Sequence, residues 1–372
     1  MGGGVMGSAT AWQLASRGYA VTLLERSSAG HTEGSSHGTS RIFRLAYPDP
    51  FYVSLAARAL PLWRQAEQES GRAVLTLTGA VDHGPVAAIE ALHAQLERAG
   101  HVSGVLSPDQ AGERWPGLRF DTSVLFHAAA GRVHADHAVL AFQEAAAAKG
   151  AVIRHRVRVA KLLRTGADRV EVVTTGDEVL TADAAVVAVG GWAPGLAAAT
   201  VAGLPPLRVT QEQPLHFPAA DATDWPSFIH HGGAGLTARS GRYGLAAEAG
   251  VYGLGSVDGV KVGFHGVGPV VDPDHRDRTT DLAAQAQVQE YAEHWLPGAD
   301  ASAPVATTCL YTITPDHDFV VDRDGPVTVL AGFSGHGFKF APAIGELAAD
   351  LVAGRAGARR FALGRTFGGA AR

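Results

Sequence analysis

Apolar and polar residues alternate along this chain with two different periods, one typical of helices and one typical of strands. Helical spacing covers Phe51 to Ser70, where we expect an interruption at Pro61, and Ala135 to Lys149. Short stretches rich in β-branched residues lie between such segments, as at Val152 to Val159 and Ala185 to Trp192. The pattern predicts an α/β fold. Further expected helices are Ala87 to Ala99, Asp109 to Trp115 and Arg278 to Trp295; further expected strands are Ala20 to Leu24, Leu75 to His83, two between Leu162 and Leu180, and several from Leu207 to Gly268.

A glycine fingerprint stands at the N-terminus. Gly2, Gly4 and Gly7 form a G-x-G-x-x-G pattern that an apolar helical stretch and the strand ending at Leu24 follow. In a dinucleotide site these glycines make a tight turn, let the backbone approach the pyrophosphate and let the helix pack closely. Glu25 stands where a carboxylate accepts a hydrogen bond from a ribose hydroxyl. A chance match is the alternative, since 46 residues are glycine, but the helix, strand and acid in register favour a nucleotide site.

A buried parallel strand normally precedes such a fingerprint. Here only Met1 stands before Gly2. A Rossmann-type sheet without that strand would leave a gap beside the pyrophosphate. We therefore expect the natural chain to start upstream and Met1 to be an internal start.

The order of the predicted elements indicates an FAD-binding domain of the glutathione-reductase type. A helix, a strand, a small antiparallel meander and a buried strand that enters a glycine turn follow the fingerprint, unlike the order of a simple NAD domain. Since the sequence has no repeat and no low-complexity linker, we expect this Rossmann-like domain to be interleaved with a mixed-sheet α+β substrate domain. The predicted boundaries are residues 1–78, 131–205 and 306–372 for the FAD-binding domain, and 79–130 and 206–305 for the substrate domain.

Composition and charge exclude several classes of function. A net charge of -5 and a pI near 6.4 give no basic footprint for nucleic acid. The chain contains no run of about eighteen apolar residues, the length that a membrane-spanning helix needs. A single cysteine fits a reducing cytoplasm. We therefore expect a small-molecule partner and a cytoplasmic protein, and we assign no metal site. A monomer is a separate expectation, which composition and charge do not establish.

Lysine is rare: it accounts for four of the 31 basic residues. A chain that uses arginine almost everywhere keeps lysine either by accident or where a compact ammonium with an adjustable pKa is needed. Lys149 ends a helix and Lys161 lies beside a hairpin, so both are expected to be solvated. Lys261 in VKVGFHG and Lys339 in GFKF stand in apolar, glycine-rich surroundings and are the candidates for chemistry.

Cys309 is the only cysteine, so it forms neither an internal disulfide nor a multi-thiolate metal site. Its sulfur is either an inert core filler or a single reactive nucleophile. The polar and aromatic neighbours in CLYTITPDHDF, together with the nucleotide fingerprint at the other end of the chain, favour the nucleophile.

Five segments resemble the monomeric sarcosine oxidase and N-methyltryptophan oxidase family of covalent flavoproteins, within the D-amino-acid oxidase superfamily. They run almost from end to end: GGGVMG (2–7), HTEGSSHGTSRIFRLAY (31–47), VKVGFHG (260–266), CLYTITPDHDFVVD (309–322) and AGFSGHGFKF (331–340). Members of that family oxidise secondary amino acids at the C–N bond, giving an imine that hydrolyses, and return the electrons to oxygen as hydrogen peroxide. The resemblance implies FAD as cofactor, and a small secondary amino acid and molecular oxygen as partners.

The resemblance also implies roles for individual side chains. Cys309 would carry the FAD through a thioether to a methyl of the benzenoid ring. Arg44 and Lys339 would hold the substrate carboxylate, and Arg41 would favour negative charge on the reduced ring. Lys261 would activate oxygen, because a fixed positive charge stabilises the superoxide that forms first. Without the motif, the two arginines would read as an ordinary surface pair.

Other site residues follow from the same resemblance. His265, on the same strand face as Lys261, would tune substrate binding or protonation, and Tyr252 and Tyr311 would flank the substrate. The resemblance further implies that a helix opens onto the pyrimidine edge of the flavin, where N–H groups stabilise negative charge; its first residues would be Gly335, His336, Gly337 and Phe338. A glycine-rich turn that only starts a helix is the alternative.

Two departures from the family pattern lie near the pocket. Gly255 stands where we expect proline, in a stretch after Tyr252 that is shorter than usual, and Ser36 replaces one of two adjacent histidines. The substrate therefore need not be sarcosine itself. Two other functions stay open: a dehydrogenase that passes electrons to a carrier or quinone, and a flavin-binding or flavin-free paralogue without turnover.

Overall fold

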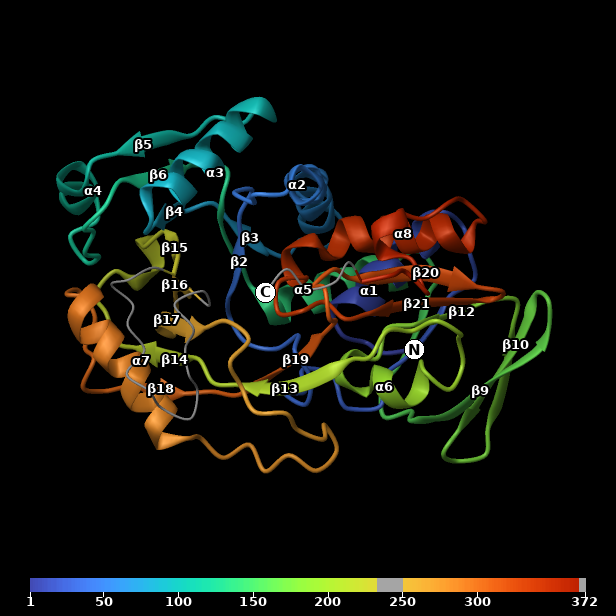
Figure 1. Ribbon diagram of the computed structural model, residues 1–372. Coiled ribbons are helices and arrows are strands. Elements are labelled where there is room, and N and C mark those ends of the chain that lie inside the picture. The colour runs from blue at the N-terminus through green and yellow to red at the C-terminus, as the bar shows by residue number, and fades with distance from the viewer. Residues whose placement is uncertain (233–249, 368–372) are drawn as a thin grey trace.

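The computed structural model describes residues 1–232 and 250–367, and shows a mixed α/β molecule with a large mixed sheet. Figure 1 shows two regions: one with α1, α2, α5 and α8 over small sheets, and one with the large sheet flanked by α3, α4 and α7. The expected fold class is confirmed. The domain boundaries given above stay a prediction, and part of the strand-rich stretch from Leu207 to Gly268, residues 233–249, lies outside the described residues.

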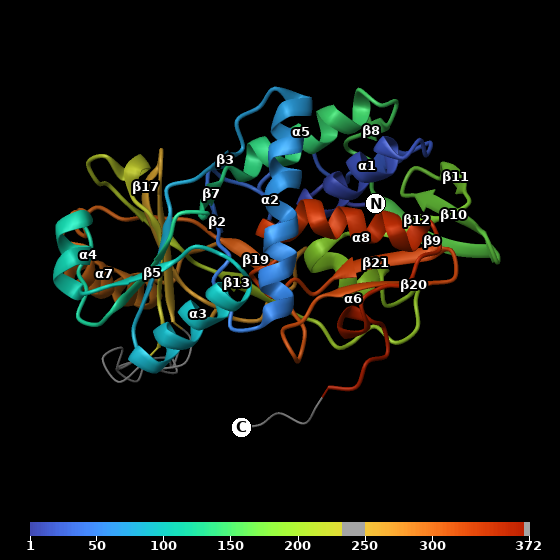
Figure 2. The same cartoon turned by 90° about the horizontal axis from the view of Figure 1, so that it is seen from above.

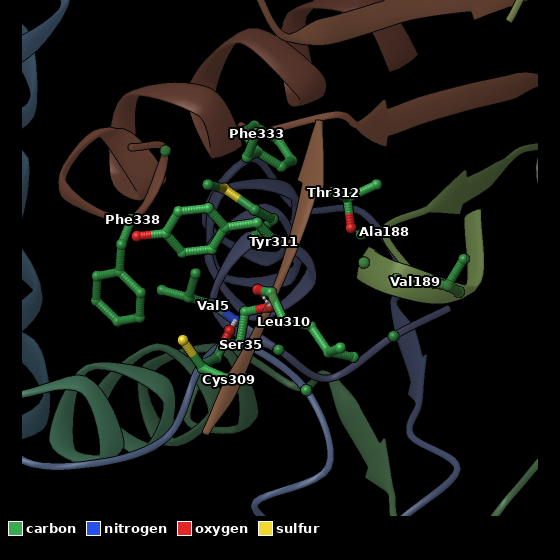
Figure 3. Close-up of a pocket in the computed structure, with 18 of the residues that line it drawn as sticks. Val5, Ser35, Ala188, Val189, Cys309, Leu310, Tyr311, Thr312, Phe333 and Phe338 are labelled. Atoms are coloured by element: carbon green, nitrogen blue, oxygen red, sulfur yellow. Dashed lines mark hydrogen bonds between the residues drawn. The ribbon is translucent and has the colours of Figure 1, made fainter. Parts of the chain in front are cut away.

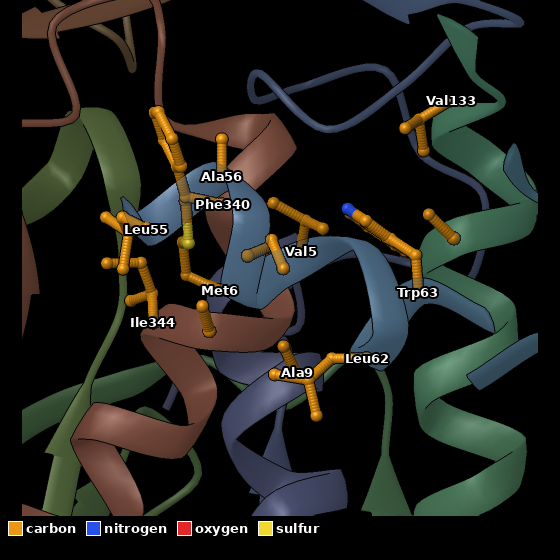
Figure 4. Packing of buried hydrophobic residues seen from close by; sticks show 14 of the residues in the cluster. Val5, Met6, Ala9, Leu55, Ala56, Leu62, Trp63, Val133, Phe340 and Ile344 are labelled. Atoms are coloured by element: carbon orange, nitrogen blue, oxygen red, sulfur yellow. The ribbon is translucent and has the colours of Figure 1, made fainter. Parts of the chain in front are cut away.

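Three helices pack closely in the first region. Helix α1 (Val5–Ser16) is buried along almost its whole length, because α5 (Ala135–Ala147) and α8 (Ala341–Val352) both lie against it. Gly345 allows α8 to approach, since a Cβ on it would stand 2.7 Å from the carbonyl carbon of Ala9. Figure 4 shows side chains of α1 and α8 meeting those of α2 (Pro50–Ser70) in one apolar cluster. This packing fixes the glycine turn that precedes α1.

Two small parallel pairs lie on either side of the glycine turn. Strand β1 (Thr22–Leu24) pairs with β8 (Val152–Arg154), and β12 (Ala185–Val187) pairs with β21 (Val327–Ala331), which β20 (Val320–Asp324) extends in antiparallel fashion. The first two residues of the chain touch both: Met1 donates its amino group to the Val186 carbonyl, and Gly2 N–H donates to the Leu24 carbonyl, each at 2.8 Å. The glycine turn therefore lies at the carboxyl ends of β1 and β12.

The meander expected after β8 is present, but it has three strands rather than the two expected between Leu162 and Leu180. They are β9 (Val159–Gly166), β10 (Arg169–Thr174) and β11 (Val179–Ala182). Figure 2 shows them at the end of the molecule away from the large sheet. Helix α6 (Ala193–Leu196) follows β12 after a 3-10 turn at Gly190–Trp192.

An eight-stranded sheet dominates the second region. Its order is β18-β14-β17-β16-β15-β4-β6-β5, and all neighbours are antiparallel except β15 and β4. Apolar side chains of this sheet pack against α7 and around Trp115 and Trp225. The strands are β4 (Ala80–His83), β5 (Gly104–Leu106), β6 (Val124–His127), β14 (Leu215–Phe217), β15 (Ser227–His230), β16 (Val251–Ser256), β17 (Gly259–Phe264) and β18 (Val305–Ala306), and the helices are α3 (Val86–Arg98), α4 (Pro108–Arg114) and α7 (Leu282–Trp295).

Two strand groups connect the regions. Strand β13 (Arg208–Glu212) pairs antiparallel with β19 (Cys309–Ile313), and β2 (Arg41–Phe43) pairs with β7 (Gly131–Val133), to which β3 (Leu75–Thr76) adds. Figure 1 shows β2, β13 and β19 between the large sheet and the helices. No helix in the described part of the chain is long and apolar enough to span a membrane.

Several expected elements differ from those observed. The strand expected from Val152 to Val159 ends at Arg154, because Arg156 takes a φ of 61° and the chain turns before β9. The strand expected from Leu75 to His83 is two strands, separated at Gly79, which has a φ of 80°.

Three helices also differ from those expected. Helix α2 passes Pro61 without a break; Asp49 caps its start, and its buried face packs around Trp63. Helix α7 starts at Leu282 rather than at Arg278, with Asp281 as its N-cap. The helix expected to open at Gly335 starts only at Ala341, after a 3-10 turn over residues 338–340.

Candidate active site

One cavity of about 920 Å³ lies where the two regions meet, and it collects almost every residue that the sequence singled out. Of that set only Gly7 does not border it. The lining includes Gly2, Gly4, Glu25, Arg41, Arg44, Tyr252, Lys261, His265, Cys309, Tyr311, Gly335, His336, Gly337, Phe338 and Lys339.

Two glycines of the turn, Gly2 and Gly7, have no room for a side chain. A Cβ on Gly2, whose φ is +92°, would stand 2.3 Å from the Ala188 carbonyl oxygen, and one on Gly7 would stand 1.9 Å from the Gly2 oxygen. Gly7 therefore serves the packing of α1 beneath the turn, while Gly2 and Gly4 face the cavity. Such a backbone cradle at a helix N-terminus suits a phosphate group.

Glu25 ties the turn to the end of β1. Its two carboxylate oxygens accept from the Gly3 and Ser27 N–H groups, each at 2.7 Å. Burial alone would raise the pKa of this carboxyl, but hydrogen bonds from His31, Ser27 and Gly3 lower it on balance, so that the group is ionised. Glu25 borders the cavity as an anion; the ribose contact stays a prediction.

Cys309 is the first residue of β19 and stands opposite Glu212 of β13. Figure 3 shows its sulfur turned into the same space as the rings of Tyr311 and Phe338. Burial raises the pKa of the thiol, and the positive charges of Arg41 and Lys261 oppose that shift. The sulfur therefore lies at the wall of the cavity, beside two cations that favour a thiolate.

Arg41 organises the loop that covers this part of the cavity. Its guanidinium donates to the carbonyls of Ser35, His37 and Ser40 at 2.8 to 2.9 Å. It also lies over the Phe338 ring, 5.6 Å from the ring centre. The charge is held in place by backbone contacts, without an acidic partner among the residues described.

Lys261 projects from β17, near the middle of the large sheet, and only 8% of it is exposed. Burial first, and then Arg41, lowers the pKa of its ammonium to about 7, against the opposing charges of Cys309 and Asp258. Its nitrogen forms no hydrogen bond or ion pair within residues 1–232 and 250–367. A buried ammonium without a partner is costly, which indicates a functional rather than a structural role.

His265 and the two tyrosines form the next part of the wall. The His265 ring lies 5.4 Å from that of Tyr311, and burial, followed by the charge of Lys339, lowers the pKa of His265 to about 4. The imidazole is therefore neutral at physiological pH. Burial raises the pKa of both Tyr252 and Tyr311, so each remains a hydrogen-bond donor.

Arg44 and Lys339 both lie against Tyr47. Lys339 donates from Nζ to the Tyr47 hydroxyl at 2.9 Å and to the His336 carbonyl at 2.8 Å. The Arg44 guanidinium lies 4.6 Å from the centre of the Tyr47 ring. Burial first, and then Arg44, lowers the pKa of Lys339 well below its ordinary value. An anion between these two cations would be favourable.

The glycines before α8 allow an aromatic side chain to approach the backbone. A Cβ on Gly335 would stand 2.1 Å from the Tyr311 ring, and one on Gly337 would stand 2.6 Å from Phe333. His336 is partly buried, which lowers its pKa well below the usual range, and it contacts the His317 carbonyl at 3.2 Å. This segment shapes the wall around Tyr311, while the helix itself begins six residues after Gly335.

An acid that the sequence did not lead us to expect lies beside the cation pair. Asp82 is fully buried, and its Oδ1 atom lies 2.8 Å from His231 Nε2 and 3.4 Å from Arg44 Nη1. Burial would raise the pKa of this carboxyl, but the hydrogen bond with His231 and the charge of Arg44 lower it on balance. An acid inside the apolar strand AVDH is a signal, since a buried carboxylate needs partners, but the sequence does not show that His231 is one.

The described residues fit FAD. A glycine turn with little room for side chains stands at one end of the cavity, the only cysteine stands along its wall, and its basic lining residues include Arg41, Arg44, Lys261 and Lys339.

Comparison with known proteins agrees with this arrangement. Residues 1–351 match the family described as FAD dependent oxidoreductase. The monomeric sarcosine oxidase of Bacillus sp. (strain B-0618) is 30% identical over 365 residues, which cover 95% of this chain and 90% of that protein. The N-methyl-L-tryptophan oxidase of Yersinia pestis is 28% identical over 373 residues, covering 94% and 92%. Among solved structures, NikD, an amino acid oxidase of nikkomycin biosynthesis, superposes with a TM-score of 0.81 at 24% identity over 97% of this chain and 95% of that one.

Proposed function

The chain belongs to the family of FAD-dependent oxidoreductases, and on this premise we propose that it oxidises sarcosine-like N-methyl or other secondary amino acids. The C–N bond becomes an imine that water hydrolyses, and oxygen becomes hydrogen peroxide. One observation carries the proposal: Cys309, Lys261 and the cation pair of Arg44 and Lys339 all border one cavity. The sarcosine and N-methyltryptophan oxidases among its relatives support the substrate class.

FAD would extend along the cavity from the glycine turn toward the large sheet. Gly2 and Gly4 would face its pyrophosphate, and Cys309 would hold its ring system through a thioether. When bound, FAD supplies a two-electron acceptor for the C–N bond and a donor for oxygen. The protein binds and orients the substrate and supplies the charges around the reacting atoms.

Arg44 and Lys339 are proposed to orient the substrate through its carboxylate. The guanidinium offers two parallel donors and the ammonium a point charge, and a carboxylate between them would relieve their mutual repulsion. Asp82 neutralises part of the Arg44 charge from the side that faces the sheet. The ring of His265, neutral because its pKa is lowered to about 4, can accept a hydrogen bond from the substrate amine without adding a charge.

Lys261 is proposed to act on oxygen. Its ammonium is buried and has no ion-pair partner in the described structure, so its charge remains available to a developing anion. Arg41, fixed by three backbone carbonyls, adds a second charge to the same wall. We further propose a monomer acting in the cytoplasm, a reducing compartment that suits a chain with a single cysteine.

The function can be tested with oxygen and an artificial electron acceptor in parallel. Purified protein is supplied with sarcosine and a panel of N-methyl amino acids, and oxygen uptake and hydrogen peroxide are measured. We expect one peroxide per oxygen consumed with at least one secondary amino acid. Turnover with the artificial acceptor alone would assign a dehydrogenase instead. Absence of both, in flavin-loaded protein, would contradict the proposed activity.

A further inference from the structure

A second cluster of titratable side chains lies on the other face of the large sheet. Strands β4 and β15 run parallel, with His83 directly opposite His230. Because strand residues alternate between faces, these histidines point away from Asp82, which faces Arg44. They pack instead against α7, where the Trp295 ring lies 4.5 Å from that of His230. Asp121, in the loop before β6, completes the cluster.

The three side chains are close enough to share one ion. One nitrogen of each histidine and a carboxylate oxygen of Asp121 all lie within 4.8 Å of one another. The two imidazole rings are 4.0 Å apart at their centres and tilted by 32°. Nitrogen and oxygen ligands bind Zn²⁺ at about 2.0 to 2.2 Å, so small side-chain rotations would bring the three atoms into one coordination shell.

Both histidines are buried side by side, and imidazole is the side chain that most often binds transition metals. One bonding position is also unmet: His83 Nδ1 is buried and has no hydrogen-bond partner in the described part of the chain.

A partner outside the three ligands holds one of the rings. Tyr291 places its hydroxyl 3.3 Å from His230 Nδ1. Burial raises the pKa of Tyr291, so the phenol stays neutral. If Nδ1–H donates to the phenol oxygen, Nε2 keeps its lone pair for a ligand, which is the usual arrangement around metal-bound histidines.

We propose that His83, His230 and Asp121 bind one divalent transition metal ion of the Zn²⁺ class. Two imidazoles and one carboxylate suit zinc or its neighbours and not Mg²⁺ or Ca²⁺, which prefer oxygen ligands alone. Asp121 is exposed, so water can complete the coordination. The ion would fasten the loop of Asp121 to β4 and β15, the strands that carry Asp82 and lead into His231.

The test is a calorimetric titration of Zn²⁺ into chelator-treated, FAD-loaded protein without an added histidine tag. We expect one saturable site, weakened tenfold or more in both His83→Gln and His230→Gln, and no comparable heat with Mg²⁺. His275→Gln is the matched control, because His275 forms an exposed pair with Asp272 on the surface; its titration should equal that of the wild type.

Folding of the variants is checked by flavin content and melting temperature. If either histidine variant fails to fold, Asp121→Asn decides the question, since this exposed residue can change without loss of the core; it should weaken Zn²⁺ binding and reduce the rise in melting temperature that Zn²⁺ gives the wild type. Absence of saturable binding in the wild type would refute the site. Equal affinity in the wild type and in the folded variants would do the same.

Discussion

At the scale of single residues, burial decides the charge of the groups around the cavity. Lys261 and Lys339 both have lowered pKa values, and His265 is neutral, because none of them is well solvated. Arg41 and Arg44 are guanidinium groups and keep their charge under such conditions. These two arginines and two lysines thus combine two permanent charges with two ammonium groups whose charge responds to what binds beside them.

Lys261→Met should slow the reaction with oxygen by several orders of magnitude and leave anaerobic reduction by substrate almost unchanged. The charge acts on the anion that forms from oxygen, and the amine does not need it. Stopped-flow absorbance of the flavin measures both steps. Lys161→Met is the control, because Lys161 is an exposed lysine at the rim of the same cavity. An equal loss in both steps would place Lys261 in substrate binding.

The same variant should stabilise the flavin-free protein. Because the pKa of Lys261 falls from 10.5 to about 7 on folding, the unfolded chain binds more protons between those pH values, and stability rises with pH across that window. The full penalty of burying the charge is present below pH 7. Lys261→Met removes it, so the unfolding free energy at pH 7 should rise by about 1.4 kcal/mol or more, the value of one pKa unit. Denaturant titrations should show that the difference in unfolding free energy between variant and wild type decreases toward pH 10. A difference that does not change with pH would mean that the charge of Lys261 does not cause it.

Arg44→Met or Lys339→Met should weaken a carboxylate inhibitor roughly tenfold or more. A charge-assisted hydrogen bond is worth about 1.5 to 3 kcal/mol, and neither cation can reproduce the contact of the other. Flavin difference spectra give the dissociation constants. Lys149→Met removes an ammonium that is paired with Glu69 on the surface and should change nothing. Unaltered constants in both cavity variants would remove this pair from the substrate site.

At the scale of elements, close contacts between helices position the site. Helices α1 and α8 touch at Gly345, and α1 in turn fixes the glycine turn at the end of the cavity. The turn before α8 also makes a close contact, because Gly335 has no side chain and the Tyr311 ring packs directly against its backbone. Small residues at these contacts therefore control the shape of the cavity from a distance.

Gly345→Ala should destabilise the protein by about 1 to 3 kcal/mol, the usual range for an overpacked contact, although alanine is the better helix former. The added carbon would meet the backbone of Ala9 and push α1 from α8, so flavin content should fall too. Gly112→Ala is the control: Gly112 lies in α4 with no neighbour within 4 Å of its Cβ position, and alanine there should stabilise by up to about 1 kcal/mol. Urea unfolding compares the two. Higher stability in both variants would show that α1 and α8 can move apart without loss of stability.

The sequence predicted these elements well where the hydrophobic periodicity was strong. It predicted them poorly where the conformation of one residue determines where an element ends or continues. The α/β class and the meander followed from patterns that many residues share. The end of β8 depends on the left-handed conformation of Arg156, and the continuity of α2 depends on tertiary packing that outweighs Pro61. At the cavity the motifs located the cations and the cysteine. Asp82 was missed because its partner His231 is distant in sequence and only the pairing of β4 with β15 brings the two strands together.

At the scale of the whole molecule, the cavity belongs to both regions at once. The glycine turn stands at one side, β16 and β17 of the large sheet stand at the other, and β19 runs between them. A cofactor that fills this space would contact both regions. Its covalent attachment at Cys309 would then hold the two regions together through β19.

Cys309→Ser should release the flavin on acid precipitation, whereas the wild-type pellet should stay yellow. Serine is far too weakly ionised to replace a thiolate. In the wild type, the tryptic peptide that contains Cys309 should be heavier by the mass of FAD. The variant should still bind FAD through the glycine turn, with little turnover. Release of all flavin from FAD-loaded wild type would return Cys309 to the role of a core thiol.

The parallel pairing of β4 with β15 has a consequence for folding. Strand β4 ends at residue 83 and β15 begins at residue 227. The two strands can therefore pair only after a loop of well over a hundred residues has closed. Such distant pairings slow folding. During synthesis, β4 to β6 leave the ribosome long before their partner exists, with the edge of β4 unpaired and open to aggregation. Slow translation or an early supply of FAD should therefore raise the yield of native protein more than a lower temperature after synthesis.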